Sequence, residues 1–279
     1  MPRLRILLLT ALAMLAFAGN SLLCRIALKE TAIDAASFTL IRILSGALVL
    51  LLIVGMQGTV RRMARDWIAA FALFAYAACF SFAYVSLSAG TGALLLFGAV
   101  QATMIGYGLW RGEHLSLRRV AGFLCAFAGM VGLMLPGLTA PPLVGAVLMM
   151  ASGIAWGFFS IRGKRTGDPV LVITGSFVRA APFAVVLSIL LWPSAALDRA
   201  GVWYAILSGG ATSGVGYVIW YTALRGLTVT SAAAVQLTVP VIAAIGGVVL
   251  LGEAVSLRLV LASIAILGGV AVALTGKRT

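Results

Sequence analysis

The sequence predicts an all-α integral membrane protein with ten transmembrane helices arranged as two inverted five-helix repeats. Three observations lead to this prediction: an apolar composition, a series of long apolar runs, and a faint repeat between the two halves of the chain. Apolar residues make up 62% of the 279 residues and charged residues only 10%, whereas soluble domains have about 45–50% and about 25%. With so few charged residues, a soluble protein of this size would expose a large apolar surface to water. We therefore expect this surface to face lipid.

Ten apolar runs have the length of membrane spans, because a helix needs about 20 mostly apolar residues to cross a bilayer. Only helices and closed barrels cross lipid, and these runs lack the period-two alternation of barrel strands. The connections between them are short, which leaves no room for a soluble domain. The expected spans are residues 4–24, 36–56, 67–87, 91–110, 117–135, 142–161, 169–191, 201–223, 231–251 and 256–275.

The first run admits two interpretations. Arg3 and Arg5, an apolar stretch and then Ala16-Phe17-Ala18 resemble a secretory signal with a small-x-small cleavage site. However, the apolar stretch continues through Leu23, which is long enough to span a bilayer. We favour an uncleaved first helix.

The distribution of basic residues predicts the topology. Nucleic-acid binders concentrate Lys and Arg on one face or in one tail, but here short basic clusters alternate with apolar runs, as in cytoplasmic loops. With the N-terminus inside, fourteen Lys and Arg residues lie in cytoplasmic segments and four on the opposite side. We therefore expect no nucleic-acid partner despite the net charge of +13, and a multi-pass protein of the bacterial inner membrane with both termini cytoplasmic.

Short matches relate the two halves of the chain. RGEHLSLRR at 111–119 and LGEAVSLRL at 251–259 share Gly-Glu and Ser-Leu-Arg at an offset of 140, and Arg42 pairs with Arg179 at 137. We assign the first repeat to residues 1–137 and the second to residues 138–279. Because five helices is an odd number, the second half starts on the opposite side of the membrane. Inverted repeats are typical of secondary transporters, whose site lies near the midplane.

Ten helices in two halves, each closing with a Gly-Glu pair (Gly112-Glu113 and Gly252-Glu253) before its last helix, resemble the drug/metabolite transporter superfamily, EamA type. The chain is most similar to the amino-acid exporter branch typified by YddG. This resemblance implies a central cavity lined by the spans 4–24, 67–87, 91–110, 142–161, 201–223 and 231–251. It also implies that the spans 117–135 and 256–275 pack outside.

Charged residues offer few candidates for chemistry. The seven acidic residues fall at helix ends or in loops, and the single histidine, His114, lies in a loop. We interpret Glu113 and Glu253 as helix-end contacts rather than ion-coupling groups. No nucleophile–base pair, metal cluster or phosphate-binding loop occurs in the sequence, so we expect neither an enzyme nor a cofactor. Arg42 and Arg179 lie inside spans and have two interpretations: a structural or snorkelling role, or contact with a substrate carboxylate.

Aromatic and polar residues inside the spans complete the predicted substrate site. Aromatic residues recur four apart, which places them on one helix face, and tyrosine hydroxyls deep in a membrane favour a wet cavity over lipid. Amides in spans are likewise expected to face the bundle interior. The candidate binding residues are Asn20, Phe80, Tyr84, Gln101, Trp156, Tyr217, Tyr221 and Gln236, with Arg42 and Arg179.

These patterns predict a transporter that exports small organic metabolites by alternating access. We expect amino acids with aromatic or other apolar side chains, or similar zwitterions, as substrates, with the lipid bilayer as the other partner and a monomer as the working unit. Two alternatives stay open: efflux of other metabolites or drugs, and a non-transporting membrane enzyme or scaffold.

Overall fold

The computed structural model describes residues 3–58, 65–111, 117–135, 140–163, 168–227, 232 and 235–275, and within these ranges every regular element is a helix. Seven helices are long and apolar enough to cross a membrane, and three shorter apolar helices accompany them. One of the seven is composite, because α8, η3 and α9 follow one another without a break over Arg199–Leu224. The described chain is therefore all-helical and has the spans of a membrane protein, as the sequence predicts.

The helices follow the expected spans closely. They are α1 (Arg3–Glu30), α2 (Ala35–Met56), α3 (Trp67–Tyr84), α4 (Ala89–Trp110), α5 (Leu117–Met134), α6 (Leu143–Gly163), α7 (Pro169–Leu190), η2 (Trp192–Ser194), α8 (Arg199–Ile206), η3 (Leu207–Val215), α9 (Gly216–Leu224), α11 (Thr238–Leu251) and α12 (Leu257–Thr275). The largest difference concerns the expected span 231–251. Its described helix begins only at Thr238, and residues 231, 233 and 234 of this span lie outside the described ranges.

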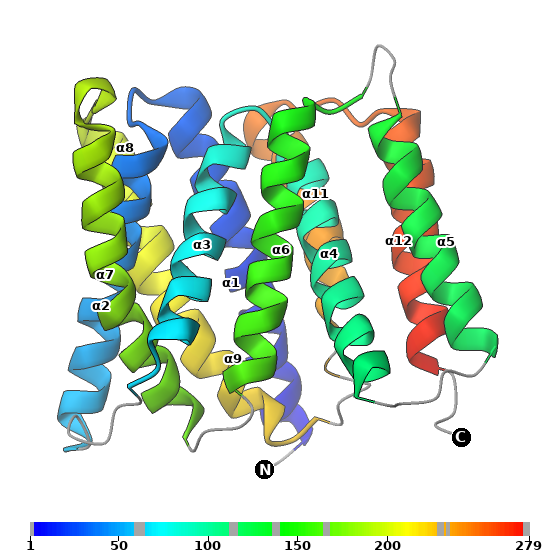
Figure 1. The fold of residues 1–279 in the computed structure, drawn as a ribbon, viewed down its shortest axis with the longest axis horizontal. Coiled ribbons are helices and arrows are strands. Elements are labelled where there is room, and N and C mark those ends of the chain that lie inside the picture. The colour runs from blue at the N-terminus through cyan, green and yellow to red at the C-terminus, as the bar shows by residue number, and fades with distance from the viewer. Residues whose placement is uncertain are drawn as a thin grey trace.

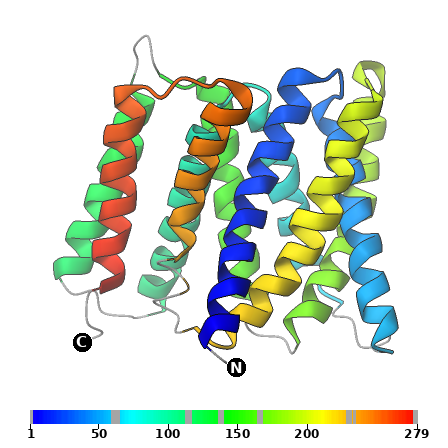
Figure 2. The ribbon, with the colours of Figure 1, turned by 180° about the vertical axis from the view of Figure 1, so that it is seen from behind.

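The helices stand side by side in one bundle and successive helices run in opposite directions (Figure 1). The start of α1 and the end of α12 lie at the same end of the bundle, here called the terminal end (Figures 1 and 2). At one edge, α5 and α12 pack against each other. A Cβ added at Gly122 would lie 2.4 Å from the carbonyl oxygen of Gly269. Only glycines therefore allow this pair its close contact, which agrees with the outer position that the resemblance implies for these two helices.

Many contacts link helices before residue 137 with helices after it. Helices α3 and α4 pack on α6, and α9, η3 and α11 pack on α1. The contacts α2 with α7, α4 with α11, and α5 with α12 complete the pattern. Adding or subtracting the sequence offset of about 137–140 residues turns the contact of α3 with α6 into that of α9 with α1. The same shift exchanges the two partners in pairs such as α2 with α7.

Four aspartates begin helices, which explains why acidic residues gather at helix ends. Each accepts a hydrogen bond from the first-turn backbone of its helix, as N-cap residues do. In Asp66, burial raises the pKa, but the Arg162 guanidinium and the N–H groups of α3 together hold the pKa below its usual range. The four caps are Asp34 of α2, Asp66 of α3, Asp168 of α7 and Asp198 of α8.

The centre of the composite helix is a π-helix, η3, which the sequence analysis does not predict. Its glycines bring its backbone against α2: a Cβ added at Gly209 would lie 2.0 Å from the carbonyl oxygen of Arg42. π-helical turns are rare and are often found at functional sites. Here the widened turn carries Ser208 and Thr212, whose hydroxyls face the centre of the bundle.

Candidate functional site

A small cavity lies at the centre of the bundle, between α1, α3, α4, α6 and the segment formed by η3 and α9. The volume open to the centres of water molecules is about 30 Å³, which corresponds to about two waters. An amino acid is several times larger, so a substrate of that size requires the helices to move apart. The wall consists of Phe17, Asn20, Ser21, Tyr76, Phe80, Leu96, Phe97, Trp156, Thr212 and Tyr217.

Aromatic rings from four helices meet across this cavity. The rings of Trp156 and Tyr217 stack with 5.0 Å between centroids and 25° between planes, and Trp156 also lies 4.8 Å from Tyr76. Phe17 packs against Tyr217 at 5.8 Å, and Phe80 against Tyr76 at 5.5 Å. Offset and tilted pairs at such distances are favourable beyond the area that they bury. The rings form an apolar box that suits a flat or branched apolar group.

A chain of polar groups crosses the box and links three helices. Asn20 of α1 donates from Nδ2 to the Tyr76 hydroxyl at 3.4 Å. Its Oδ1 accepts from the Ser208 hydroxyl at 2.7 Å, and the Thr212 hydroxyl lies within 3.3 Å of the same oxygen. Because Asn20 is only 6% exposed, these bonds satisfy an amide that would otherwise be costly to bury. The box therefore combines an apolar wall with a few convergent polar groups, as small-molecule sites generally do.

Arg42 of α2 lies directly behind this wall. Its side chain is only 1% exposed, and its Nη2 donates to the Tyr76 hydroxyl at 3.0 Å. The guanidinium carbon sits 5.2 Å from the ring centroid of Tyr76 and 4.8 Å from that of Phe80, which are cation–π distances. The side chain is thus fully buried and does not snorkel to the membrane surface.

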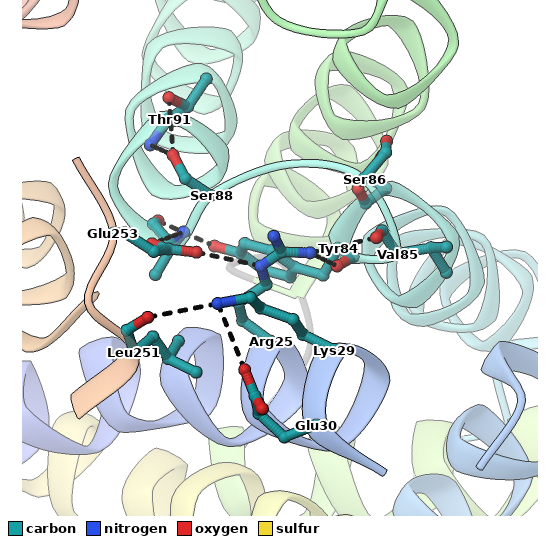
Figure 3. Close-up of polar contacts among 12 residues, drawn as sticks. Arg25, Lys29, Glu30, Tyr84, Val85, Ser86, Ser88, Thr91, Leu251 and Glu253 are labelled. Carbon is teal, nitrogen blue, oxygen red and sulfur yellow. Dashed lines mark hydrogen bonds and ion pairs between the residues drawn. The ribbon is translucent and has the colours of Figure 1, made fainter. Parts of the chain in front are cut away.

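At the end of the bundle opposite the terminal end lies a cluster of polar contacts around Arg25, here called the Arg25 clasp (Figure 3). Arg25 pairs through Nε with Oε1 of Glu253 at 3.0 Å, and its Nη1 donates to the carbonyl oxygens of Tyr84 and Val85 at 2.8 and 3.0 Å. The other carboxylate oxygen of Glu253 accepts the backbone N–H of Ala89 at 2.8 Å. The clasp therefore joins α1, the turn between α3 and α4, and the loop before α12. Glu253 thus makes contacts of the kind expected at a helix end, with an arginine and a backbone N–H, whereas Glu113 lies outside the described residues.

Four of the predicted site residues line the cavity, namely Asn20, Phe80, Trp156 and Tyr217. Two pairs of aromatic wall residues have the offsets found in the sequence: Phe17 and Trp156 lie 139 residues apart, and Phe80 and Tyr217 lie 137 apart. Of the spans expected to form the wall, 231–251 is the one from which no described residue lines this cavity.

The other predicted residues lie elsewhere in this structure. Tyr84 is fully buried next to Phe80 and its hydroxyl donates to the carbonyl oxygen of Ala89. Gln101 lines a separate small pocket between α4, α5 and α12. Arg179 donates to the carbonyl oxygen of Gly175 in its own helix. Tyr221 packs beside the core, and Gln236 lies half-buried just before α11; neither reaches the cavity wall. Sequence position alone places these side chains in a span but does not fix which face of the helix they occupy.

Several wall residues escaped the sequence analysis. Phe17 and Ser21 lie three residues before and one residue after the predicted Asn20, at the spacing of one helix face on α1, which is the signal that could have identified them. Tyr76 belongs to the same stripe as Phe80 and Tyr84 but was not among the predicted binding residues. Thr212 could not be placed without the π-helix, because an extra residue in the turn shifts every later side chain around the helix axis.

The described wall of the cavity contains neither a carboxylate nor an imidazole. Among the residues that the structure describes, no three His, Cys, Asp or Glu side chains gather in a way that could hold a metal ion. The arrangement provides an apolar box with hydroxyl and amide groups and an arginine behind it, which suits the binding of a small molecule.

Comparison with known proteins assigns the chain to a family. A model of the EamA-like transporter family matches residues 4–135 and, separately, residues 143–275. The chain belongs to the EamA-like transporter family. It is therefore a multi-pass membrane transporter, and its expected substrates are small molecules.

Individual relatives agree with this assignment. An uncharacterized protein of Pseudomonas aeruginosa is 55% identical over 278 residues, which cover 99% of this chain and 97% of that protein. An uncharacterized transporter of Archaeoglobus fulgidus is 26% identical over 260 residues, covering 85% and 86% of the two chains. A solved crystal structure is similar in fold, with a TM-score of 0.68 at 20% identity over 99% of this chain and 100% of that one.

Proposed function

We propose that this EamA-family transporter exports small amphipathic metabolites, and foremost amino acids with aromatic or other apolar side chains, by alternating access through the central cavity. The observation that carries the proposal is the box of aromatic rings crossed by one polar chain at the centre of the bundle. An amino acid with an apolar side chain requires both kinds of wall. Membership of an amino-acid exporter branch typified by YddG is part of this proposal.

The proposal includes two inverted repeats of five spans, residues 1–137 and 138–279. The family model matches each half by itself, and the contacts between helices are related by the same offset as the sequence matches. In Figure 1, α1 and α6, which begin the two halves, run in opposite directions. Two halves of opposite orientation can exchange their conformations, which opens a central site to each side in turn.

The small volume of the cavity suits an occluded step of such a cycle. The Arg25 clasp ties elements of both halves together at one end of the bundle. Near the terminal end, Arg162 of α6 pairs with Asp66 at the start of α3 and joins the halves a second time. In the proposed cycle these two contacts open alternately, and a substrate enters while one of them is broken.

Counterflow in proteoliposomes tests the proposal. Vesicles that contain purified protein are loaded with one unlabelled amino acid at high concentration and diluted into a trace of the same labelled compound. We expect transient uptake of label for phenylalanine, leucine or related amino acids. A parallel set with apolar drugs and other metabolites separates the substrate classes. Uptake of those compounds alone would replace the amino-acid proposal, and no counterflow of any compound would favour a protein that does not transport.

A further inference from the structure

The charge on Arg42 lacks a counter-ion within the described structure. Its Nη2 donates to Tyr76, but its buried Nη1 has no hydrogen-bond partner among the described residues. The ion pairs described in the chain lie elsewhere: Arg25 with Glu253, Lys29 with Glu30, and Arg162 with Asp66. Two aromatic faces and one hydroxyl are the contacts that stabilise the guanidinium.

Such an arrangement is unfavourable in the empty protein. Moving a charged group from water into the protein without an ion-pair partner costs several kcal/mol of free energy. A cation–π contact and a neutral hydrogen bond together offset only part of this cost. If Arg42 served only for packing, the folded protein would be more stable with an apolar or amide side chain of similar size at this position. The buried donor instead indicates a partner that arrives from outside the chain.

We propose that the partner is an anionic group of the transported molecule, a carboxylate, so that the cavity selects organic monoanions with an aromatic or apolar body. This inference rests on the proposed function, because it names the substrate class of the same cavity. Tyr76 and Phe80 both line the cavity and both contact the guanidinium. A rearrangement of these two rings as the cavity opens brings the guanidinium to the cavity surface. Arg presents two parallel N–H groups that match a carboxylate.

The ammonium group of an amino acid finds no equivalent partner. The described wall contains no carboxylate, so an ammonium group meets only the Asn20 amide oxygen, hydroxyls and ring faces. Asn20 Oδ1 already accepts from Ser208, which reduces what it offers to a ligand. Affinity therefore depends on the carboxylate. A monocarboxylate of the same shape binds at least as well as the zwitterionic amino acid, and an amine without a carboxylate binds poorly.

Equilibrium binding to the purified wild-type protein tests the charge preference without a mutation. Three compounds share one phenyl body: 3-phenylpropionate, phenylalanine and 2-phenylethylamine. Competition against labelled phenylpropionate should show comparable affinity for the first two. The amine should bind about tenfold to about a hundredfold more weakly, as expected for the loss of a charge-assisted hydrogen bond. Equal or tighter binding of the amine, or no saturable binding of the carboxylates, overturns the inference.

Variants then assign the effect to Arg42. Arg42→Gln should lose the preference for carboxylates, while Arg42→Lys should keep part of it because the charge remains. Arg199→Gln serves as the matched control, because Arg199 is exposed and its loss also removes one positive charge. The melting temperature of Arg42→Gln without ligand separates the two roles: an unpaired charge predicts an unchanged or raised value. A lowered melting temperature together with unchanged ligand preference would show that Arg42 is structural.

The same experiments separate this inference from the proposed function. If carboxylates bind through Arg42 but no compound shows counterflow, recognition of the anion stands and transport does not. If counterflow occurs with neutral or cationic compounds but not with carboxylates, transport stands and the carboxylate inference is wrong. Should Arg42→Gln fail to fold, the wild-type series and Arg42→Lys still decide the question.

Discussion

Arg25 and Glu253 lie 228 residues apart in the sequence and form an ion pair with 3.0 Å between Nε and Oε1. Their side chains are only 12% and 10% exposed, and both also bind backbone groups around the turn between α3 and α4. One pair of side chains thus fastens the end of α1, the start of α4 and the loop before α12 together. No sequence motif predicts the partner of Arg25, because the pair forms only once the two halves have packed.

Weakening the clasp should open the end opposite the terminal end. Glu253→Gln removes the charge but keeps an oxygen for the Ala89 N–H. Because charge-assisted hydrogen bonds are roughly twice as strong as neutral ones, the open population should rise about tenfold, which corresponds to about 1.4 kcal/mol. Cys24, which is fully buried beside Arg25, reports the opening through its labelling rate with a membrane-impermeant maleimide after Cys79 and Cys125 are replaced by Ser.

The control for the clasp is Glu30→Gln. Glu30 lies at the same end of the bundle and pairs with Lys29, but its side chain is 53% exposed, and exposed pairs contribute little. Its substitution should leave the labelling rate of Cys24 unchanged. Equal rates in all three proteins would show that the clasp does not hold this end closed.

Both termini should lie in the cytoplasm. The reason is the excess of basic residues in the loops on that side, fourteen against four. A fluorescent protein fused after the last residue should fluoresce in the cytoplasm, and alkaline phosphatase inserted at Pro141, between the two halves, should be active. An inactive phosphatase at Pro141 combined with a dark C-terminal reporter would reverse the topology and the orientation of both repeats.

Transport should require neither a proton nor a sodium gradient. Carriers coupled to these ions usually have a carboxylate inside the membrane, and the described wall of the cavity contains none. Proteoliposomes loaded with labelled substrate should therefore equilibrate at the same rate with and without an imposed gradient. Accumulation against the substrate gradient that a protonophore abolishes would contradict this prediction.

The helical spans could be predicted from the sequence because they depend on hydropathy and helix ends. Long apolar runs and Asp residues at N-caps set nearly every helix boundary within a few residues. The repeat offsets also anticipated which aromatic positions meet: Phe80 and Tyr217 are equivalent by sequence and lie in the same wall. The apolar runs and N-caps are local signals and the repeat offset is a periodic one, so both can be found in a single sequence.

The site could be predicted only in part because it depends on how helices are rotated about their axes. Gln101 and Asn20 are both amides inside spans, yet Asn20 faces the central cavity and Gln101 faces the pocket beside α5 and α12. Almost every face of such helices is apolar, so no amphipathic stripe distinguishes the inner face from the lipid-facing one. The π-helix η3 also rotates the side chains that follow it about the helix axis, and this π-helix packs its backbone against α2 at Gly209.

Gly209→Ala should destabilise the protein. The added methyl group would meet the carbonyl oxygen of Arg42 and the Ser45 hydroxyl, and neither backbone can retreat without shifting a helix. Overpacking of this kind costs about 1–3 kcal/mol. Thermal unfolding in detergent should show a lower melting temperature, whereas Gly55→Ala, which meets nothing within 4 Å, should leave it unchanged or raise it slightly. Equal melting temperatures for the two variants would mean that α2 and η3 are not in close contact.

Trp156 should matter for transport more than for folding. Its indole ring stacks on Tyr217 and packs on Tyr76 across the cavity, and it is only partly buried. A ring at the edge of a cavity that must open has fewer fixed neighbours than a core ring. Trp156→Ala should therefore abolish most counterflow while the folded yield in detergent stays near that of the wild type.

The competing possibility is that Trp156 simply fills the core, and stability measurements decide between the two. Truncation of a large core side chain costs about 3–5 kcal/mol, so a packing role predicts a sharply lower melting temperature and aggregation in detergent. Trp203→Ala provides the control, because Trp203 is 56% exposed on α8 and its loss should affect neither measurement. Trp156→Phe retains a ring and should recover part of the transport if the aromatic face contacts the substrate. Normal transport by a well-folded Trp156→Ala protein would remove this residue from the proposed binding site and leave Tyr76, Phe80 and Tyr217 as its aromatic wall.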